Sequence, residues 1–173
     1  MLKNTKISFL LPHVGATQLS YILMNNIHKY YQQNNHLVDF IIFYENMQKP
    51  CIMPPCTIMN IAELWSHSGI SIATTYNTAQ TLIKVAGPTR KILYLWDLEW
   101  KRHIYPYSIL SSVYCNKDID IICRSKSHYD LFKNMFNREP LGIVEDCNLD
   151  ILGDILSCKN SDMIKADFFQ KCQ

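Results

Sequence analysis

The chain has 173 residues, of which 48% are hydrophobic and 18% are charged, and its formal net charge is +2. This length suits one domain, and the composition is that of a globular protein with a buried core rather than a disordered chain. The small net charge, without a run of Lys or Arg, excludes the strongly basic surface by which many domains bind nucleic acid. We therefore expect no nucleic-acid partner.

The seven cysteines lack the paired short spacings of a zinc site. Cys51 and Cys56 are close in sequence, but no matching second pair follows. We therefore expect free thiols in a reducing compartment and no metal. The first apolar stretch is too short for a secretion signal, and no stretch approaches the ~20 apolar residues of a membrane span. These features predict a cytoplasmic protein without a membrane span.

The first part of the chain predicts a strand, a helix and a second strand. Residues 6–11 form the first predicted strand, 12–15 the loop after it, and 16–31 the first helix. Residues 37–44 are almost continuously apolar, as expected for a parallel strand that is buried on both faces. The prolines within 45–55 predict a loop, because proline cannot donate to a sheet ladder.

The middle of the chain repeats this pattern around the segment that organises it. Residues 57–65 are interpreted as a short helix, and the apolar residues 70–73 as a strand. The polar residues 74–77 can cap a helix over 78–85, which Gly87-Pro88 ends. Another buried strand follows at 92–95.

The remaining elements continue the alternation of strands and helices. We expect helices at 105–114, 125–136 and 151–157, strands at 119–123 and 141–144, and either a helix at 163–169 or disorder in the tail. This order predicts an α/β fold: one Rossmann-like, doubly wound, mostly parallel sheet of about five or six strands flanked by helices. Residues 1–150 would form that domain, and residues 151–173 a helical tail that packs on it or is partly disordered.

The best candidate site follows the predicted strand 92–95. Trp96-Asp97-Leu98-Glu99-Trp100 places two carboxylates between two indoles. Ligands of open α/β sheets bind beyond the carboxyl ends of the strands. On an extended segment Asp97 and Glu99 would share one face and could bind sugar hydroxyls, while Trp96 or Trp100 would stack on a sugar ring. The alternative is that Asp97 caps a helix or pairs with Arg102, and that the indoles belong to the core.

Further polar residues follow the neighbouring predicted strands. Thr75 and Tyr76, with Thr74 and Asn77, could bind a ligand, although helix capping explains Thr75 or Asn77 equally well. Arg124 could meet a phosphate or a carboxylate, and the alternative is a surface ion pair. The sequence contains no G-x-G-x-x-G, P-loop or G-x-S-x-G motif, which argues against dinucleotide, P-loop and hydrolase sites.

Several segments resemble the N-terminal domain of GT-B type glycosyltransferases, especially the rhamnosyltransferase-like and family 4 members. Residues 73–79 are similar to a strand followed by "ATxWxTA", and residues 96–99 to a strand ending in "QDYE". Residues 123–127 resemble the "xxSxxS" transition from strand to helix in that domain. Residues 142–150 resemble a degraded form of the family's "vIpNGvD" hinge segment. The resemblance covers roughly residues 6–150 and implies a Rossmann-like lobe that holds the sugar acceptor.

The sequence departs from this family in three respects. The hinge-like segment is followed by only 23 residues, which leaves no room for the domain that binds the nucleotide sugar. The loop after the first strand contains one glycine, whereas the family's loop is glycine-rich, and Trp96 replaces the usual Gln. We therefore expect no cofactor in this chain, and a nucleotide-sugar donor only if a partner chain supplies the second half.

The resemblance also implies roles for His13 and Asp97. In some inverting members a His near the first loop deprotonates the acceptor hydroxyl, and an imidazole suits that role because its pKa is near neutrality. Asp97 is the expected partner carboxylate, and an exposed loop histidine is the alternative for His13.

Three hypotheses about function follow. The first is a glycosyltransferase-like, acceptor-side half that is inactive alone or acts with a partner chain; its catalytic residues would be Asp97 and His13, and its substrate-binding residues Thr75, Tyr76, Glu99, Trp96 and Arg124. The second is a non-catalytic interaction module that binds another protein or forms a homodimer. The third is a small α/β enzyme of another class that uses Asp97.

Overall fold

The computed structural model describes residues 5–34, 38–50, 52–102 and 106–157. In these residues seven strands form one sheet with the order β3-β2-β1-β4-β5-β6-β7, and every neighbouring pair is parallel. The strands are β1 (Thr5–Val14), β2 (Val38–Met47), β3 (Thr57–Asn60), β4 (Ile70–Ala73), β5 (Arg90–Leu95), β6 (Asp120–Cys123) and β7 (Gly142–Ile143). The predicted Rossmann-like α/β class is confirmed.

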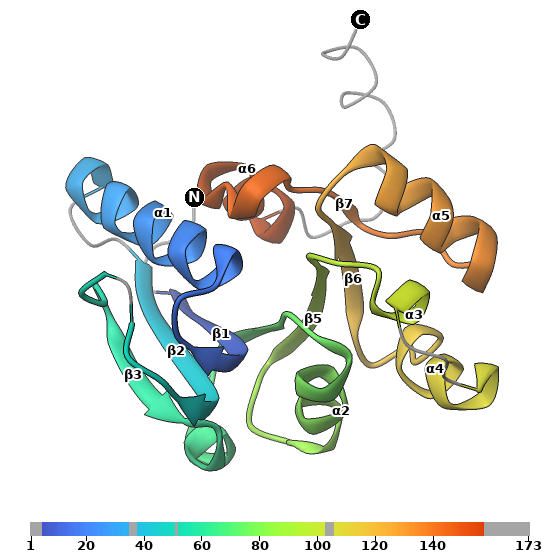
Figure 1. Ribbon diagram of the computed structural model, residues 1–173, viewed down its shortest axis with the longest axis horizontal. Helices are drawn as coiled ribbons and strands as arrows, with labels where there is room; N and C mark the ends of the chain where they lie inside the picture. The colour runs from blue at the N-terminus through green and yellow to red at the C-terminus, as the bar shows by residue number, and fades with distance from the viewer. Residues whose placement is uncertain (1–4, 35–37, 51, 103–105, 158–173) are drawn as a thin grey trace, which may run out of the picture.

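Helices connect the strands and cover both faces of the sheet (Figure 1). They are α1 (Gln18–Asn34), α2 (Tyr76–Lys84), α3 (Glu99–Arg102), α4 (Tyr107–Tyr114), α5 (Lys126–Phe136) and α6 (Leu149–Ser157), with the 3-10 helices η1 (Ile61–Ser66) and η2 (Glu145–Cys147). None of the helices in these ranges is long and apolar enough to cross a membrane. The tail helix expected at 163–169 lies outside the described residues.

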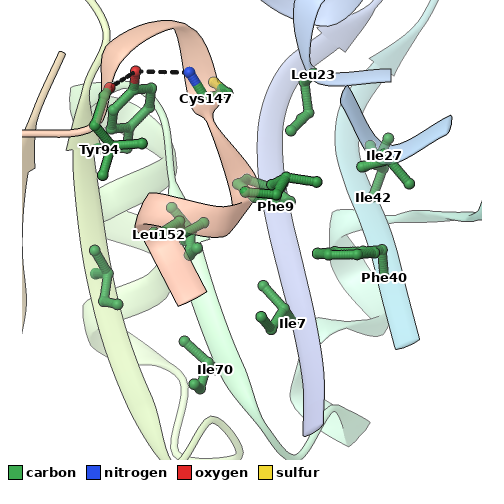
Figure 2. Close-up of a cluster of buried hydrophobic side chains, with 14 of the residues drawn as sticks. Ile7, Phe9, Leu23, Ile27, Phe40, Ile42, Ile70, Tyr94, Cys147 and Leu152 are labelled. Carbon is green, nitrogen blue, oxygen red and sulfur yellow. Dashed lines mark hydrogen bonds between the residues drawn. The ribbon is translucent and has the colours of Figure 1, made fainter. Parts of the chain in front are cut away.

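The strands are apolar on both faces because each face is covered. Alternate residues point to opposite faces of a strand, so Ile92 and Tyr94 of β5 lie in one core and Leu93 and Leu95 in the other. The first core is closed by α1 and α6, which lie side by side above the sheet in Figure 1, and Figure 2 shows part of it. The second core is closed by α2, α4 and α5.

The structure contains one strand more than the five or six expected, because part of the segment 57–65 is not helical. Thr57–Asn60 forms β3, which pairs with β2 from Ile41 to Tyr44. Helical structure begins only at Ile61, where the Asn60 side chain accepts the N–H of Ala62 at 2.9 Å. The prediction of a helix from Thr57 was therefore wrong, because the backbone pairs across the sheet instead.

The first strand is also longer than expected. β1 continues through Pro12 to Val14, so His13 belongs to the strand and not to a loop. Pro12 has no N–H to donate, but β1 pairs with β4 only as far as Leu10, so β1 has a neighbour on one side alone at this point. A proline is tolerated in such an edge position, and the ladder to β2 resumes at His13.

One histidine, His67, is buried in the fold without a hydrogen-bond partner for its Nε2 among the described residues. His67 is 6% exposed, and its ring lies edge-on to Phe43 at 5.5 Å. Burial, with the Lys6 cation nearby, lowers the pKa of His67 below its usual value, although the Ile70 backbone and Asp39 act in the opposite direction. The folded state therefore disfavours a charged imidazole.

We predict that the free energy of unfolding falls as the pH drops below about 6.5, the ordinary pKa of histidine. Below that value the unfolded chain binds a proton that folded His67 resists, and the loss grows until the pH passes the lowered pKa of the folded state. Urea unfolding between pH 5 and 8 should show a smaller loss in His67→Phe than in the parent. The exposed His28 supplies the control, and equal pH dependence in His67→Phe and His28→Gln would contradict the prediction.

Candidate functional site

The carboxyl ends of the parallel strands bring the predicted site residues to one edge of the sheet. His13 lies near the end of β1, Thr75 follows β4, Trp96 follows β5 and Arg124 follows β6. The sheet order puts β4, β5 and β6 side by side. The residues occupy one edge, but their side chains fall into separate groups.

The segment after β5 is not extended as expected. Trp96 and Asp97 lie in a bend, and Glu99 begins α3. Asp97 accepts the N–H of Leu98 at 2.9 Å and pairs with Arg102 at 2.8 Å. The prediction that Asp97 and Glu99 share one face of an extended segment was wrong, because the chain bends at Trp96 and Asp97 and is helical from Glu99. The pairing of Asp97 with Arg102 is the alternative that the sequence left open.

Glu99 belongs to the group at the start of α2. Its Oε2 accepts the N–H of Tyr76 at 2.8 Å, where the exposed backbone donors of a helix N-terminus favour a negative charge. Thr75 caps the same helix, because its hydroxyl accepts the N–H of Thr78 at 3.2 Å. The Tyr76 hydroxyl donates to the carbonyl of Ile109 at 2.9 Å. Glu99 thus ties α3 to the start of α2, Thr75 caps α2, and Tyr76 ties α2 to α4.

A second group joins β5, β6 and η2. The Arg124 guanidinium lies 3.8 Å from the centre of the Trp96 ring, a cation–π contact. The same guanidinium pairs with the Asp146 carboxylate at 2.7 Å through Nη2 and 3.1 Å through Nε. The Arg124 side chain is 29% exposed. This stack of indole, guanidinium and carboxylate is open to solvent at the edge where ligands of such sheets bind.

Asp146 lies in a strained turn, which we call the η2 strap (residues 144–148). Asp146 has φ 44° and ψ 42°, and Cys147 has φ 55°, a left-handed conformation that costs a residue with a Cβ roughly 1–2 kcal/mol. The Asn26 amide of α1 donates to the carbonyls of both residues, at 2.7 and 3.1 Å. Such strain persists only where the surroundings impose it, and it occurs often at functional sites.

Two hydrogen bonds of the Tyr94 hydroxyl hold the η2 strap to β5. Its hydroxyl donates to the carbonyl of Val144 at 2.6 Å and accepts the N–H of Cys147 at 3.2 Å (Figure 2). Burial raises the pKa of Tyr94, so the phenol keeps its proton. Asn26, Tyr94 and Asp146 were not among the site residues predicted from the sequence. A polar Asn26 on the otherwise apolar face of α1 was the available signal.

Tyr94→Phe should lower the free energy of unfolding by about 1–3 kcal/mol, because it leaves a buried N–H and a buried carbonyl without their partner. Urea unfolding measures this change. Tyr107→Phe is the matched control, since Tyr107 is 56% exposed and its hydroxyl should contribute little. Equal stability of the two variants would show that the Tyr94 hydroxyl does not hold the strap.

His13 is half-buried, and its carbonyl accepts from the hydroxyl of Ser20 at 3.3 Å. Among the residues that the structure describes, the His13 side chain makes no ion pair with a carboxylate, Asp97 included. In the loop after β1, a Cβ at Gly15 would lie 2.7 Å from Oε1 of Gln48, so the Gln48 side chain approaches this loop closely. No group of three or more potential metal ligands occurs in the described part of the chain.

Comparisons with known proteins do not place the chain in a family. No protein-family model matches it, and no curated protein sequence matches it. One solved structure with a similar chain is the homoserine dehydrogenase of S. aureus, at 14% identity and a TM-score of 0.33. The match covers 78% of this chain and 30% of that enzyme, so this chain spans less than a third of its length. A similarity this weak carries no argument about function.

Proposed function

We propose that this chain is the acceptor-side lobe of a GT-B type glycosyltransferase and acts with a nucleotide-sugar-binding half supplied from outside residues 1–173. The supporting observation is where the family-like segments lie. The segments 73–79, 96–99 and 123–127 begin at or just after the carboxyl ends of β4, β5 and β6, and the segment 142–150 contains β7 and continues past its carboxyl end. These four strands are successive neighbours in the sheet. Four segments far apart in sequence therefore meet at the edge where an acceptor would face a donor.

The geometry favours different roles for the residues at this edge. Trp96 and Arg124 present an aromatic ring and a guanidinium beside the strand ends, so we assign them to substrate contact. Thr75 caps α2, Glu99 bonds to the first turn of α2 and Tyr76 bonds to α4, so these three residues would hold the edge in shape. His13 and Asp97 remain the proposed bases. One of them would take the proton of an acceptor hydroxyl while its oxygen bonds to the anomeric carbon and the nucleoside diphosphate leaves.

Tryptophan emission tests this proposal directly. The chain contains three tryptophans, and Trp65 is 63% exposed on η1, where its carbonyl lies near Gly87, which precedes β5. We would titrate nucleotide sugars and free sugars, alone and with any candidate second chain. The expected change in emission should disappear in Trp96→Phe and persist in Trp65→Phe. If no ligand of the panel changes the tryptophan emission, with or without a second chain, the proposal is overturned.

A second candidate function is a non-catalytic interaction module that forms a homodimer. Four large apolar side chains on α4 and α5 are exposed: Tyr107 by 56%, Ile109 by 43%, Leu131 by 37% and Met135 by 39%. Tyr107 also stacks on Phe136, which joins the two helices. Sedimentation velocity distinguishes this candidate, because Met135→Ser should shift a dimer towards monomer. A monomer at all concentrations would exclude the homodimer.

A further inference from the structure

A hollow of about 310 Å³ lies between α1 and the segment formed by η2 and the start of α6. Its size is at the lower end of small-molecule sites, about 300–1,000 Å³. It includes Asp146 of the η2 strap. The lining side chains are Asn26, Lys29, Tyr30, Gln33, Glu145, Asp146, Asn148, Leu149 and Asp150.

Three charged side chains of this hollow form no ion pair with the described residues. Among the described residues, Lys29, Glu145 and Asp150 take part in no ion pair. Asp146 is different, because Arg124 neutralises it. Two carboxylates and one ammonium group therefore remain, which gives the hollow one excess negative charge.

The chemistry of the lining excludes several classes of ligand. Excess negative charge repels phosphates and other anions. A metal ion is not favoured, since no group of three or more potential ligands converges in the described residues. An apolar ligand would find little contact, because Leu149 and the ring of Tyr30 are the main apolar surfaces of the lining. Donors and acceptors around one aromatic ring suit a ligand whose own groups both donate and accept.

We propose that this hollow binds a polyhydroxylated ligand without negative charge, a sugar or an amino sugar, with its hydroxyl or amino groups on Glu145 and Asp150 and its ring beside Tyr30. The inference rests on the proposed function in one respect, because the bound sugar would be the acceptor. The η2 strap connects the two places: Asp146 lines the hollow and also pairs with Arg124 on Trp96.

Ligand-observed saturation-transfer NMR on the full chain tests this site with glucosamine, glucose and glucose 6-phosphate. We expect the strongest signal for glucosamine, a weaker one for glucose and the weakest for the phosphate. Glu145→Gln should reduce the glucosamine signal several-fold. The control is Glu63→Gln, which removes an equally exposed carboxylate from η1 and should leave the signal unchanged. Thermal unfolding establishes that both variants are folded.

Three results would overturn the inference: no signal for any of the three sugars, equal binding of glucose 6-phosphate and glucosamine, or a glucosamine signal unaffected by Glu145→Gln. The failure of this site is separable from the failure of the proposed function. If nucleotide sugars change the emission of Trp96 but no sugar binds in the hollow, the further inference is wrong and the proposed function stands. Sugar binding that depends on Glu145, without any Trp96-dependent response, would support the hollow and remove the glycosyltransferase proposal.

Discussion

Phe132→Ala should lower the free energy of unfolding by about 3–5 kcal/mol, the usual cost of removing a large buried ring. Phe132 lies on the buried face of α5 and is fully buried. Its ring contacts those of Trp100, Tyr114 and Phe136, with distances of 5.0–6.2 Å between ring centres. Neighbouring rings cannot refill the volume without leaving their own contacts, so a cavity should remain. Urea unfolding monitored by circular dichroism gives the change.

The neighbouring Leu131 supplies the control within the same helix. It is 37% exposed, so Leu131→Ala should cost well below 1.5 kcal/mol, because little apolar area returns to water. Helix propensity is hardly affected by Leu131→Ala, since leucine and alanine are both good helix formers, and it rises slightly in Phe132→Ala, so it cannot account for a loss of stability in either variant. Similar losses in Phe132→Ala and Leu131→Ala would show that α5 is not docked through Phe132.

Arg138→Ala should produce the second large loss, about 2–4 kcal/mol, because hydrogen bonds from a charged donor contribute more than neutral ones. Arg138 follows α5 and reaches back to the connection between α4 and β6. Its guanidinium donates to the carbonyl of Tyr114 at 3.0 Å, to that of Asn116 at 2.6 Å and to that of Ile119. Three half-buried carbonyls lose their donor in the variant.

Arg138→Lys should recover only part of this stability, since an ammonium group does not reproduce the planar fork of a guanidinium. Arg102→Ala is the surface control, because its side chain is 70% exposed and its pair with Asp97 should contribute below 1 kcal/mol. The measurement is again urea unfolding. A loss in Arg138→Ala no greater than that in Arg102→Ala would contradict the assigned role.

The parallel sheet could be predicted because its signals are local. Continuous apolar runs such as those of β2 and β6 occur where both faces are covered, and a serine or threonine begins α2 and α5 as a cap. β3 could not be predicted in this way. Its residues are half-exposed or exposed, and it is a strand because its backbone pairs with β2, which is a property of the partner and not of the segment.

The position of the site at the carboxyl edge of the sheet could be predicted, but the side-chain contacts within it could not. Sequence order places Trp96 and Arg124 after neighbouring strands, and the structure stacks them. The Asp97 side chain is directed to Arg102, and the Glu99 side chain to the first turn of α2. Alternation along the sequence predicted one shared face for the two carboxylates and therefore gave the wrong geometry. The left-handed turn at Asp146 depends on Asn26 and Tyr94, 120 and about 50 residues away, and no local pattern encodes it.

The pairing at this edge has a consequence for function. Asp97, Glu99 and Asp146 each bond to a protein group rather than standing alone. A ligand at Trp96 and Arg124 would therefore compete with Asp146 for the guanidinium, and its binding would loosen the η2 strap. If both proposed sites bind ligands, the pair of Arg124 with Asp146 would connect ligand contact at the sheet edge to the shape of the hollow.

Amide chemical-shift mapping of the isotope-labelled chain with a panel of sugars and nucleotide sugars tests the account most directly. It predicts that the perturbed amides cluster after β5 and β6 and along the η2 strap, at Trp96, Arg124 and Asp146, together with the lining of the hollow. Perturbations confined to the opposite edge of the sheet, around His67 and Gly87, or no perturbation by any ligand of the panel, would contradict it.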